Sequence, residues 1–186
     1  PEGTGTMAAI LGLSKEEVEE ICKIASEFGI VEPANYNCPG QLVISGEIKA
    51  VEKAIELAKE KGAKKSVMLA VSAPFHSSML KEAGELLAKE LEKVNIKPPK
   101  IPVISNVTAN YVQKDEIKEL LIKQVSHPVL WEQSVKRMIE DGVDIFIEIG
   151  PGKTLTSFVK KINREKTALN VEDEKSLQEV FSALGV

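Results

Sequence analysis

Apolar residues in the first third of the chain recur at both helical and strand spacings. Steps of three and four residues predict one amphipathic helix over about residues 15–28 and a second over about residues 48–61. Ser14 followed by Glu17 is the pattern in which two side chains reciprocally cap a helix start. Strands are predicted around these helices by short β-rich runs, at residues 7–11, 30–31, 41–46 and 66–71.

The resulting order over residues 5–71 is β-α-β-β-α-β. This order is typical of the ferredoxin-like arrangement, in which two helices cover one face of a four-stranded antiparallel sheet. Residues 35–40 read NYNCPG, and their turn-forming types predict the turn before the third strand. The pattern therefore predicts a small ferredoxin-like domain over residues 5–71.

From residue 72 to residue 186 the pattern changes to longer helices separated by strands. Helices are predicted at about residues 77–94, 114–125, 131–141, 153–162 and 175–183, and strands at residues 101–106 and 144–149. Helices alternating with strands are typical of a parallel α/β sheet. We therefore predict a second, α/β region over residues 72–186.

Composition narrows the class of protein. Of the 186 residues 43% are hydrophobic and 28% are charged, which is typical of an ordinary globular protein. The 24 basic and 28 acidic residues are interspersed, without the basic run that a nucleic-acid partner requires. No apolar run approaches the ~18–20 residues needed to cross a bilayer, so we expect no membrane partner.

The two cysteines and the first residue add two further expectations. Cys22 and Cys38 lie outside any C-x-x-C pair, so we expect neither a zinc site nor a disulfide framework, and a reducing, cytoplasmic setting. The chain starts at Pro1 rather than at a methionine, and no signal peptide follows. We therefore expect it to begin inside a longer protein.

His76 is the first candidate for chemistry. It stands in APFHSS at residues 73–78, where a predicted strand meets a predicted helix. A histidine there can act as a general base, because its ordinary pKa of ~6.5 lets it accept and return a proton near neutrality. Judged from the residue alone, a purely structural role is the more frequent alternative. His127, before Pro128 at a predicted helix end, is predicted to cap free carbonyls.

No partner for a general base is evident in the sequence. The G-x-S-x-G elbow that would expose a nucleophilic serine is absent, and Ser77 and Ser78 are predicted to cap a helix start. Residues 150–153, GPGK, lack the spacing of a phosphate loop and are predicted to form a tight turn whose amides could attract an anion. Two histidines and two cysteines at irregular spacing predict no metal site.

Four segments resemble the malonyl-CoA:acyl carrier protein transacylase family, in the family's order and at similar separations. They are GTGTMAAILGL at residues 3–13, NYNCPGQ at 35–41, APFHSS at 73–78 and EIGPGK at 148–153. The resemblance implies an α/β fold, an α/β-hydrolase-like acyltransferase domain with an inserted ferredoxin-like small domain. Residues 72–186 would then be the C-terminal part of the large domain. It also implies that a Gly-Gln motif, a G-H-S-L-G serine elbow and a malonate-binding arginine precede Pro1.

The resemblance further implies an activity, without a cofactor or a metal. A serine activated by His76 would accept malonyl from malonyl-CoA and pass it to the phosphopantetheine thiol of acyl carrier protein, as fatty acid synthesis requires. Gln124, in QVSHPVLW at residues 124–131, would orient the His76 ring through its main-chain carbonyl. Asn35 and Asn37 resemble polar residues that line the cleft. Phe75 would crowd an α-methyl branch and favour malonyl over methylmalonyl by only ~1–3 kcal/mol.

Two alternatives stay open beside this assignment. The runner-up is a piece of an acyltransferase domain from a polyketide synthase. The other alternative is a non-catalytic module that docks acyl carrier protein or a regulator through its ferredoxin-like sheet. In each catalytic case the partners are malonyl-CoA, acyl carrier protein and the N-terminal segment of the same protein. Because this chain would supply the histidine without the serine, we expect it to be inactive alone.

Overall fold

The computed structural model describes residues 3–185 and divides the chain into two compact units, with the boundary between Ser134 and Val135. The predicted boundary between a small domain and a large domain, after residue 71, falls inside the first unit. That boundary remains a prediction for the complete protein.

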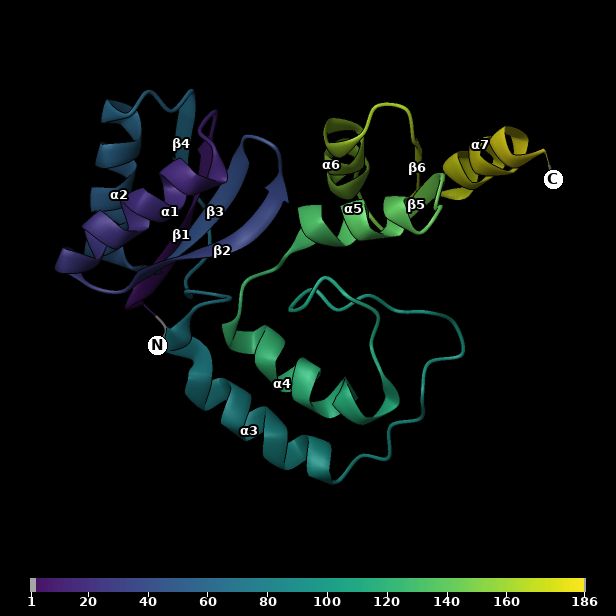
Figure 1. The fold of residues 1–186 in the computed structure, drawn as a ribbon, viewed down its shortest axis with the longest axis horizontal. Coiled ribbons are helices and arrows are strands. Elements are labelled where there is room, and N and C mark those ends of the chain that lie inside the picture. The colour runs from purple at the N-terminus through teal and green to yellow at the C-terminus, as the bar shows by residue number, and fades with distance from the viewer. Residues whose placement is uncertain (1–2, 186) are drawn as a thin grey trace. The chain divides into compact units, whose positions relative to one another are not determined.

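The first unit contains a four-stranded antiparallel sheet with the strand order β2-β3-β1-β4. Two helices cover one face of this sheet (Figure 1). The predicted β-α-β-β-α-β order is confirmed by the elements β1 (Gly5–Leu11), α1 (Lys15–Ala25), β2 (Val31–Cys38), β3 (Gln41–Glu47), α2 (Ile48–Glu60) and β4 (Lys65–Met68). A short 3-10 turn, η1 (Ser26–Phe28), follows α1.

Helix α1 begins as its sequence predicts. The Glu17 amide donates to Ser14 Oγ at 3.2 Å, and the Ser14 amide donates to the Glu17 carboxylate at 2.8 Å. The hydrogen bond from the Ser14 amide is the main reason that the pKa of Glu17 lies below its ordinary value. Between helices and sheet lies an apolar core formed by residues such as Ile10, Val18, Ile21, Ile44, Val51 and Ala54.

The predicted turn at residues 35–40 is wrong in extent. Strand β2 continues to Cys38, and only Pro39 and Gly40 separate it from β3. Register shifts between Pro33 and Asn35 and between Tyr36 and Cys38 accommodate the turn-forming residues as bulges. Pairing with β3 thus overrides the local turn preference. Asn35 and Asn37 consequently lie in a strand rather than in a turn.

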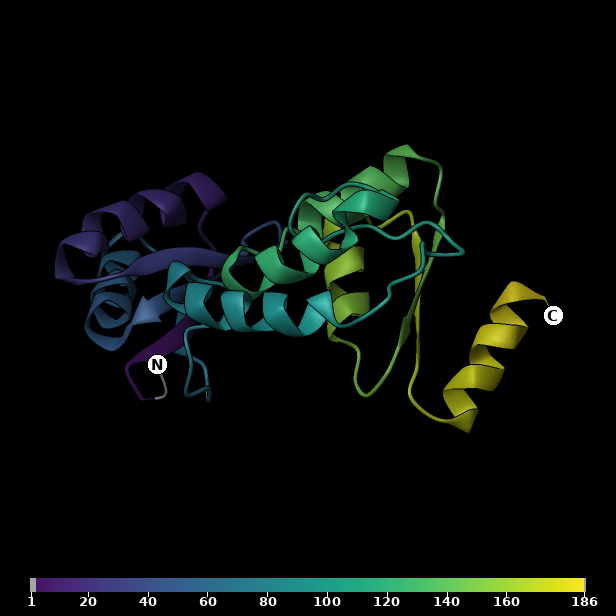
Figure 2. The same ribbon diagram turned by 90° about the horizontal axis from the view of Figure 1, so that it is seen from below.

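Helices α3 (Lys81–Glu92) and α4 (Ile117–Ser126) lie side by side (Figures 1 and 2). A Cβ atom added at Gly84 would lie 3.4 Å from the carbonyl oxygen of Ile122, about van der Waals contact, so the two helices pack closely at this position. The 3-10 turns η2 (Ser78–Leu80) and η3 (Lys114–Glu116) precede the two helices. The helix predicted from residue 77 therefore starts with a tighter turn.

The predicted strand at residues 101–106 does not form. Its one bridge joins Ile104 to Tyr111, supported by a 2.8 Å bond from the Val112 amide to the Val103 carbonyl. Pro102 has no N–H to donate, and no other strand among residues 3–185 pairs with this segment. The apolar run of residues 101–106 therefore matched the sequence pattern of a strand, but no neighbouring strand among residues 3–185 forms a ladder of hydrogen bonds with it.

The second unit contains a parallel pair, β5 (Ile145–Ile149) and β6 (Thr167–Val171), with α6 (Thr154–Ile162) and α7 (Glu174–Leu184). Parallel pairing is confirmed for these strands, whereas β6 was not predicted. Helix α5 (Trp131–Glu140) crosses the boundary between the units. Across residues 3–185, no helix combines the length and the apolar character needed to span a bilayer.

Candidate active site

His76 lies between β4 and η2 in an unusual backbone conformation. Its φ angle is 58°, in the left-handed region that residues other than glycine rarely adopt. The half-buried ring places Nδ1 2.9 Å from the main-chain oxygen of Gln124. A carbonyl oxygen can only accept, so Nδ1 carries the hydrogen and the neutral ring keeps a free lone pair on Nε2. His76 makes no other hydrogen bond within the part of the chain that the structure describes.

The Gln124 carbonyl is available to His76 because of the sequence that ends α4. In a continuing helix, this carbonyl would accept from the amide of residue 128, but that residue is Pro128 and has no N–H. His127 is extended, as a residue before proline prefers, and its Nδ1 caps the Lys123 carbonyl at 2.8 Å. The predicted capping role of His127 is confirmed.

Replacement of Pro128 by alanine should therefore weaken the hold on His76. Residue 128 would gain an N–H that can compete for the Gln124 carbonyl if α4 extends by one turn. If His76 serves as a general base in the complete protein, sharing a hydrogen bond worth ~0.5–1.5 kcal/mol corresponds to a roughly 2–10-fold lower kcat. Steady-state kinetics would compare the kcat of Pro128→Ala with that of a control variant, Pro98→Ala, at an exposed proline. Equal kcat values for the two variants would show that Pro128 does not keep the Gln124 carbonyl free for His76.

Hydrogen bonds close the turn around His76 on both sides. The buried Ser77 donates its hydroxyl to the Pro74 carbonyl at 2.7 Å, and the Ser78 amide donates to the Glu32 carboxylate at 2.7 Å. Neither serine side chain caps the helix start, so that prediction is wrong, because the distant Glu32 accepts the amide instead. A Cβ at Gly5 would lie 2.5 Å from the Pro74 side chain, so β1 packs closely against the turn.

Asn35 is brought near the same region through the backbone of β2. The Tyr36 amide donates to the Val129 carbonyl at 2.9 Å, and the Val129 amide donates to the Ala34 carbonyl at 2.8 Å. Strand β2 therefore pairs with the segment directly after α4. Asn37 is half-buried two residues further along, and no hydrogen bond joins either asparagine to His76 among the residues described.

Phe75 presents its side chain to solvent directly before His76, with 47% of its surface exposed. Its expected effect on an α-methyl branch depends on a bound substrate and remains a prediction.

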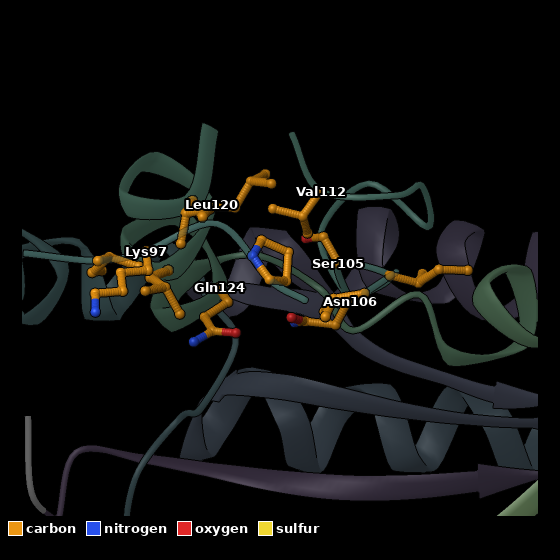
Figure 3. Close-up of a pocket in the computed structure, with 12 residues that line it drawn as sticks. Lys97, Ser105, Asn106, Val112, Leu120 and Gln124 are labelled. Carbon is orange, nitrogen blue, oxygen red and sulfur yellow. The ribbon is translucent and has the colours of Figure 1, made fainter. Parts of the chain in front are cut away.

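A pocket of about 290 Å³ lies along α4, from Ile117 to Gln124. Most of its lining is apolar and comes from residues 96–121, and Gln124 contributes its side chain. Figure 3 shows the side-chain amides of Gln124 and Asn106 on the same side of this pocket. Gln124 thus holds His76 with its main chain and lines the pocket with its side chain. Sequence reasoning did not single out Asn106, which carries no motif of its own.

Two buried residues of the first unit, Cys22 and Ser77, are unsuited to act as nucleophiles. Burial raises the pKa of the Cys22 thiol to about 12, so it stays protonated near neutrality. The Ser77 hydroxyl is buried and already donates to a carbonyl. Residues 3–185 contain no cluster of three metal-ligating side chains.

The glycine-rich segment between β5 and α6 forms a tight turn, as predicted. Amides of this turn and of the start of α6 donate to carboxylate side chains of the same chain. The Gly152 amide donates to the Glu172 carboxylate at 2.9 Å, and the Leu155 and Thr156 amides donate to Glu148 at 3.1 and 2.7 Å. Partial burial opposes ionisation of Glu148, but these hydrogen bonds outweigh it, so its pKa lies below the ordinary value. The anion at this helix start is the protein's own.

Comparisons with known proteins place the chain in a family. A family model described as acyl transferase domain matches residues 2–180. The chain is 47% identical to the malonyl CoA-acyl carrier protein transacylase of Bacillus subtilis (strain 168), over 99% of this chain and 59% of the relative. It is similar to the crystal structure of that transacylase from Clostridium perfringens, with a TM-score of 0.96 and 53% identity over 100% of this chain and 58% of the other.

A third similar structure contains a carrier protein. It is a complex of a type II PKS acyl-carrier protein with its malonyl-transacylase, with a TM-score of 0.95 and 40% identity over 98% of this chain and 60% of the other. The chain thus spans about three fifths of the length of the relatives it matches. These findings confirm the resemblance drawn from the four sequence segments.

Proposed function

This chain belongs to the acyl transferase domain family, and we propose on that premise that the complete protein transfers malonyl from malonyl-CoA to the phosphopantetheine thiol of an acyl carrier protein. The observation that carries the proposal is the hydrogen bond from His76 Nδ1 to the Gln124 carbonyl. It leaves Nε2 able to accept a proton, which is the property required of a general base. The names of the similar transacylases supply the substrates of the proposal.

The proposed reaction has two half-reactions in which the protons balance. A serine hydroxyl from the rest of the domain attacks the thioester carbonyl while its proton moves to Nε2 of His76. The C–S bond breaks, and the departing coenzyme A sulfur takes that proton. In the second half-reaction the phosphopantetheine thiol gives its proton to Nε2 and attacks the serine ester. The C–O bond breaks, and the serine oxygen recovers the proton.

In this proposal Gln124 replaces the carboxylate that orients the histidine in many hydrolases. Its carbonyl lies in the last turn of α4, where the partial negative charge of a helix C-terminus favours a transient positive charge on the ring. A neutral orienting group stabilises an imidazolium less than a carboxylate does. That suits a reversible exchange between two thioesters of similar energy.

Roles are also proposed for Asn35, Asn37 and Phe75, on the basis of where they lie in the chain. Asn35 and Asn37 would line the cleft from β2, and Phe75 would contact the acyl group beside His76. The sheet of residues 5–71 would be the ferredoxin-like small domain inserted in an α/β-hydrolase-like large domain, of which residues 72–186 form the C-terminal part. The observed strand order β2-β3-β1-β4 supports this arrangement.

The first test uses the 186-residue chain itself. Mixed with malonyl-CoA and holo acyl carrier protein, it should produce no malonyl carrier protein and no adduct above its calculated 20.3 kDa in intact-mass spectra. The reason is that the sequence lacks the G-x-S-x-G elbow. The complete protein is the positive control. A malonyl adduct on a serine of residues 1–186 would show that a nucleophile exists within them.

Fatty acid synthesis is the proposed setting, and a polyketide setting is the second candidate because one similar structure holds a type II PKS carrier protein. The complete protein should distinguish the two through its acceptors. A higher kcat/KM with a fatty acid carrier protein than with a polyketide carrier protein supports the first setting, and the reverse order supports the second.

A further inference from the structure

We propose that Glu32 is a positioning residue for His76, acting through the Ser78 amide. The proposal rests on the proposed function of His76, because a base must be held at the reacting groups. Glu32 lies 44 positions before His76 in the sequence and belongs to no motif that resembles the family. Its carboxylate accepts from the Ser78 amide at 2.7 Å, two residues after the histidine.

The backbone at His76 needs such support. A left-handed φ of 58° is strained for a side chain that has a Cβ atom, and such strain persists only where the surroundings enforce it. Within residues 3–185, Ala109 is the one other non-glycine residue with a positive φ. Relaxation of the backbone at His76 would turn the ring away from the Gln124 carbonyl.

Three hydrogen bonds enforce the conformation, and each holds a different part of the turn. The Ser77 hydroxyl closes it onto the Pro74 carbonyl, and the ring is held by Gln124. Glu32 contributes the third bond, which ties the far end of the turn to the sheet. As a hydrogen bond to an ionised acceptor, it is the strongest of the three types present.

Strand β2 connects both partners of the His76–Gln124 hydrogen bond. At Glu32 it holds the turn that carries His76, and at Ala34 and Tyr36 its backbone pairs with Val129, directly after the helix that carries Gln124. One strand is thus hydrogen-bonded both to the turn that carries the ring and to the segment that follows the carbonyl. Removal of the Glu32 carboxylate would release one of these two attachments.

Position 32 is itself held firmly within the sheet. Glu32 pairs in register with Ser45 of β3, and Ser45 pairs with Met7 of β1. Ser45 is fully buried and its hydroxyl finds no partner among the residues described. Glu32 therefore directs its carboxylate to Ser78 from a strand that is anchored on a central neighbour.

The test compares Glu32→Ala and Glu32→Gln in the complete protein, with the exposed Glu52→Ala as a control for the lost charge. Glu32→Ala should lower kcat about 10-fold, the effect of losing one charge-assisted hydrogen bond, and leave KM for malonyl-CoA within about 2-fold. Glu32→Gln keeps an acceptor oxygen and should recover most of the loss. Glu52→Ala should match the unmodified protein.

A second readout does not depend on catalysis. Hydrogen exchange of the Ser78 amide should accelerate at least about 10-fold in Glu32→Ala and much less in Glu32→Gln, since the acceptor is lost only in the first. Unchanged exchange together with unchanged kcat would overturn the proposal, as would equal losses in Glu32→Ala and Glu52→Ala. If the complete protein transferred no malonyl at all, the proposed function would fail while the exchange measurement would still decide the role of Glu32.

Discussion

In the complete protein, His76→Ala is expected to lower kcat/KM for malonyl transfer by about 10²–10⁴-fold, the usual contribution of a positioned general base. The reason is specific to the ring. Nδ1 is committed to the Gln124 carbonyl, so the variant loses the one atom, Nε2, that is free to accept the serine proton. Quenched-flow measurement of covalent malonyl-enzyme formation would locate the loss in the acylation step.

Imidazole added to the His76→Ala protein separates the loss of the base from a loss of the folded structure. Because the half-buried ring leaves a gap beside α4 when it is removed, free imidazole should restore part of the activity without a change in melting temperature. A variant that retains full acylation rates would show that the ring is structural. So would a variant that loses activity only because it unfolds.

Gly46→Ala is expected to destabilise the four-stranded sheet by about 3 kcal/mol, the upper end of the usual cost of overpacking. A Cβ atom there would lie 2.0 Å from the main-chain oxygen of Ile30 and 2.6 Å from the Cα of Val31. Both neighbours are backbone and cannot rotate away, so β2 and β3 would have to separate. For a protein of this size, the melting temperature should fall by roughly 6–12 °C.

Ser45→Ala, one residue away on the same strand, is the matched control. The Ser45 hydroxyl is buried without a partner among the residues described, so its removal should be neutral or slightly stabilising. Thermal unfolding of the two variants followed by circular dichroism would compare them. Equal melting temperatures for Gly46→Ala and the unmodified protein would mean that the close contact with Ile30 is absent in solution.

Strands β1 and β3 were predicted well as short β-rich runs, and nearly every residue in them is buried. Helices α1 and α2 were predicted well because each buries one regular face. Residues 18, 21, 22 and 25 show this for α1, where all four side chains are buried. Predictions failed where a distant partner decides the structure. Pairing with β3 straightened residues 35–38 into a strand, and the lack of a ladder left residues 101–106 irregular.

In the candidate site, too, features set by nearby residues could be predicted from the sequence, whereas features set by distant contacts could not. A single histidine before two serines did not by itself indicate a base, and the resemblance to a family was needed to connect His76 with Gln124. Pro128 is a local signal that frees the Gln124 carbonyl, and it can be read from the sequence once the end of α4 is known. The role of Glu32 could not be predicted, because it depends on a contact across 46 positions.

The ring tautomer of His76 decides whether Nε2 can receive a proton. In ¹⁵N NMR spectra of the complete protein, at a pH where the ring is neutral, the hydrogen should reside on Nδ1 and Nε2 should be unprotonated. His127 also donates from Nδ1, so a His127→Gln variant would assign the two rings. A neutral His76 with its hydrogen on Nε2 would contradict the account, because that nitrogen could not then receive the serine proton.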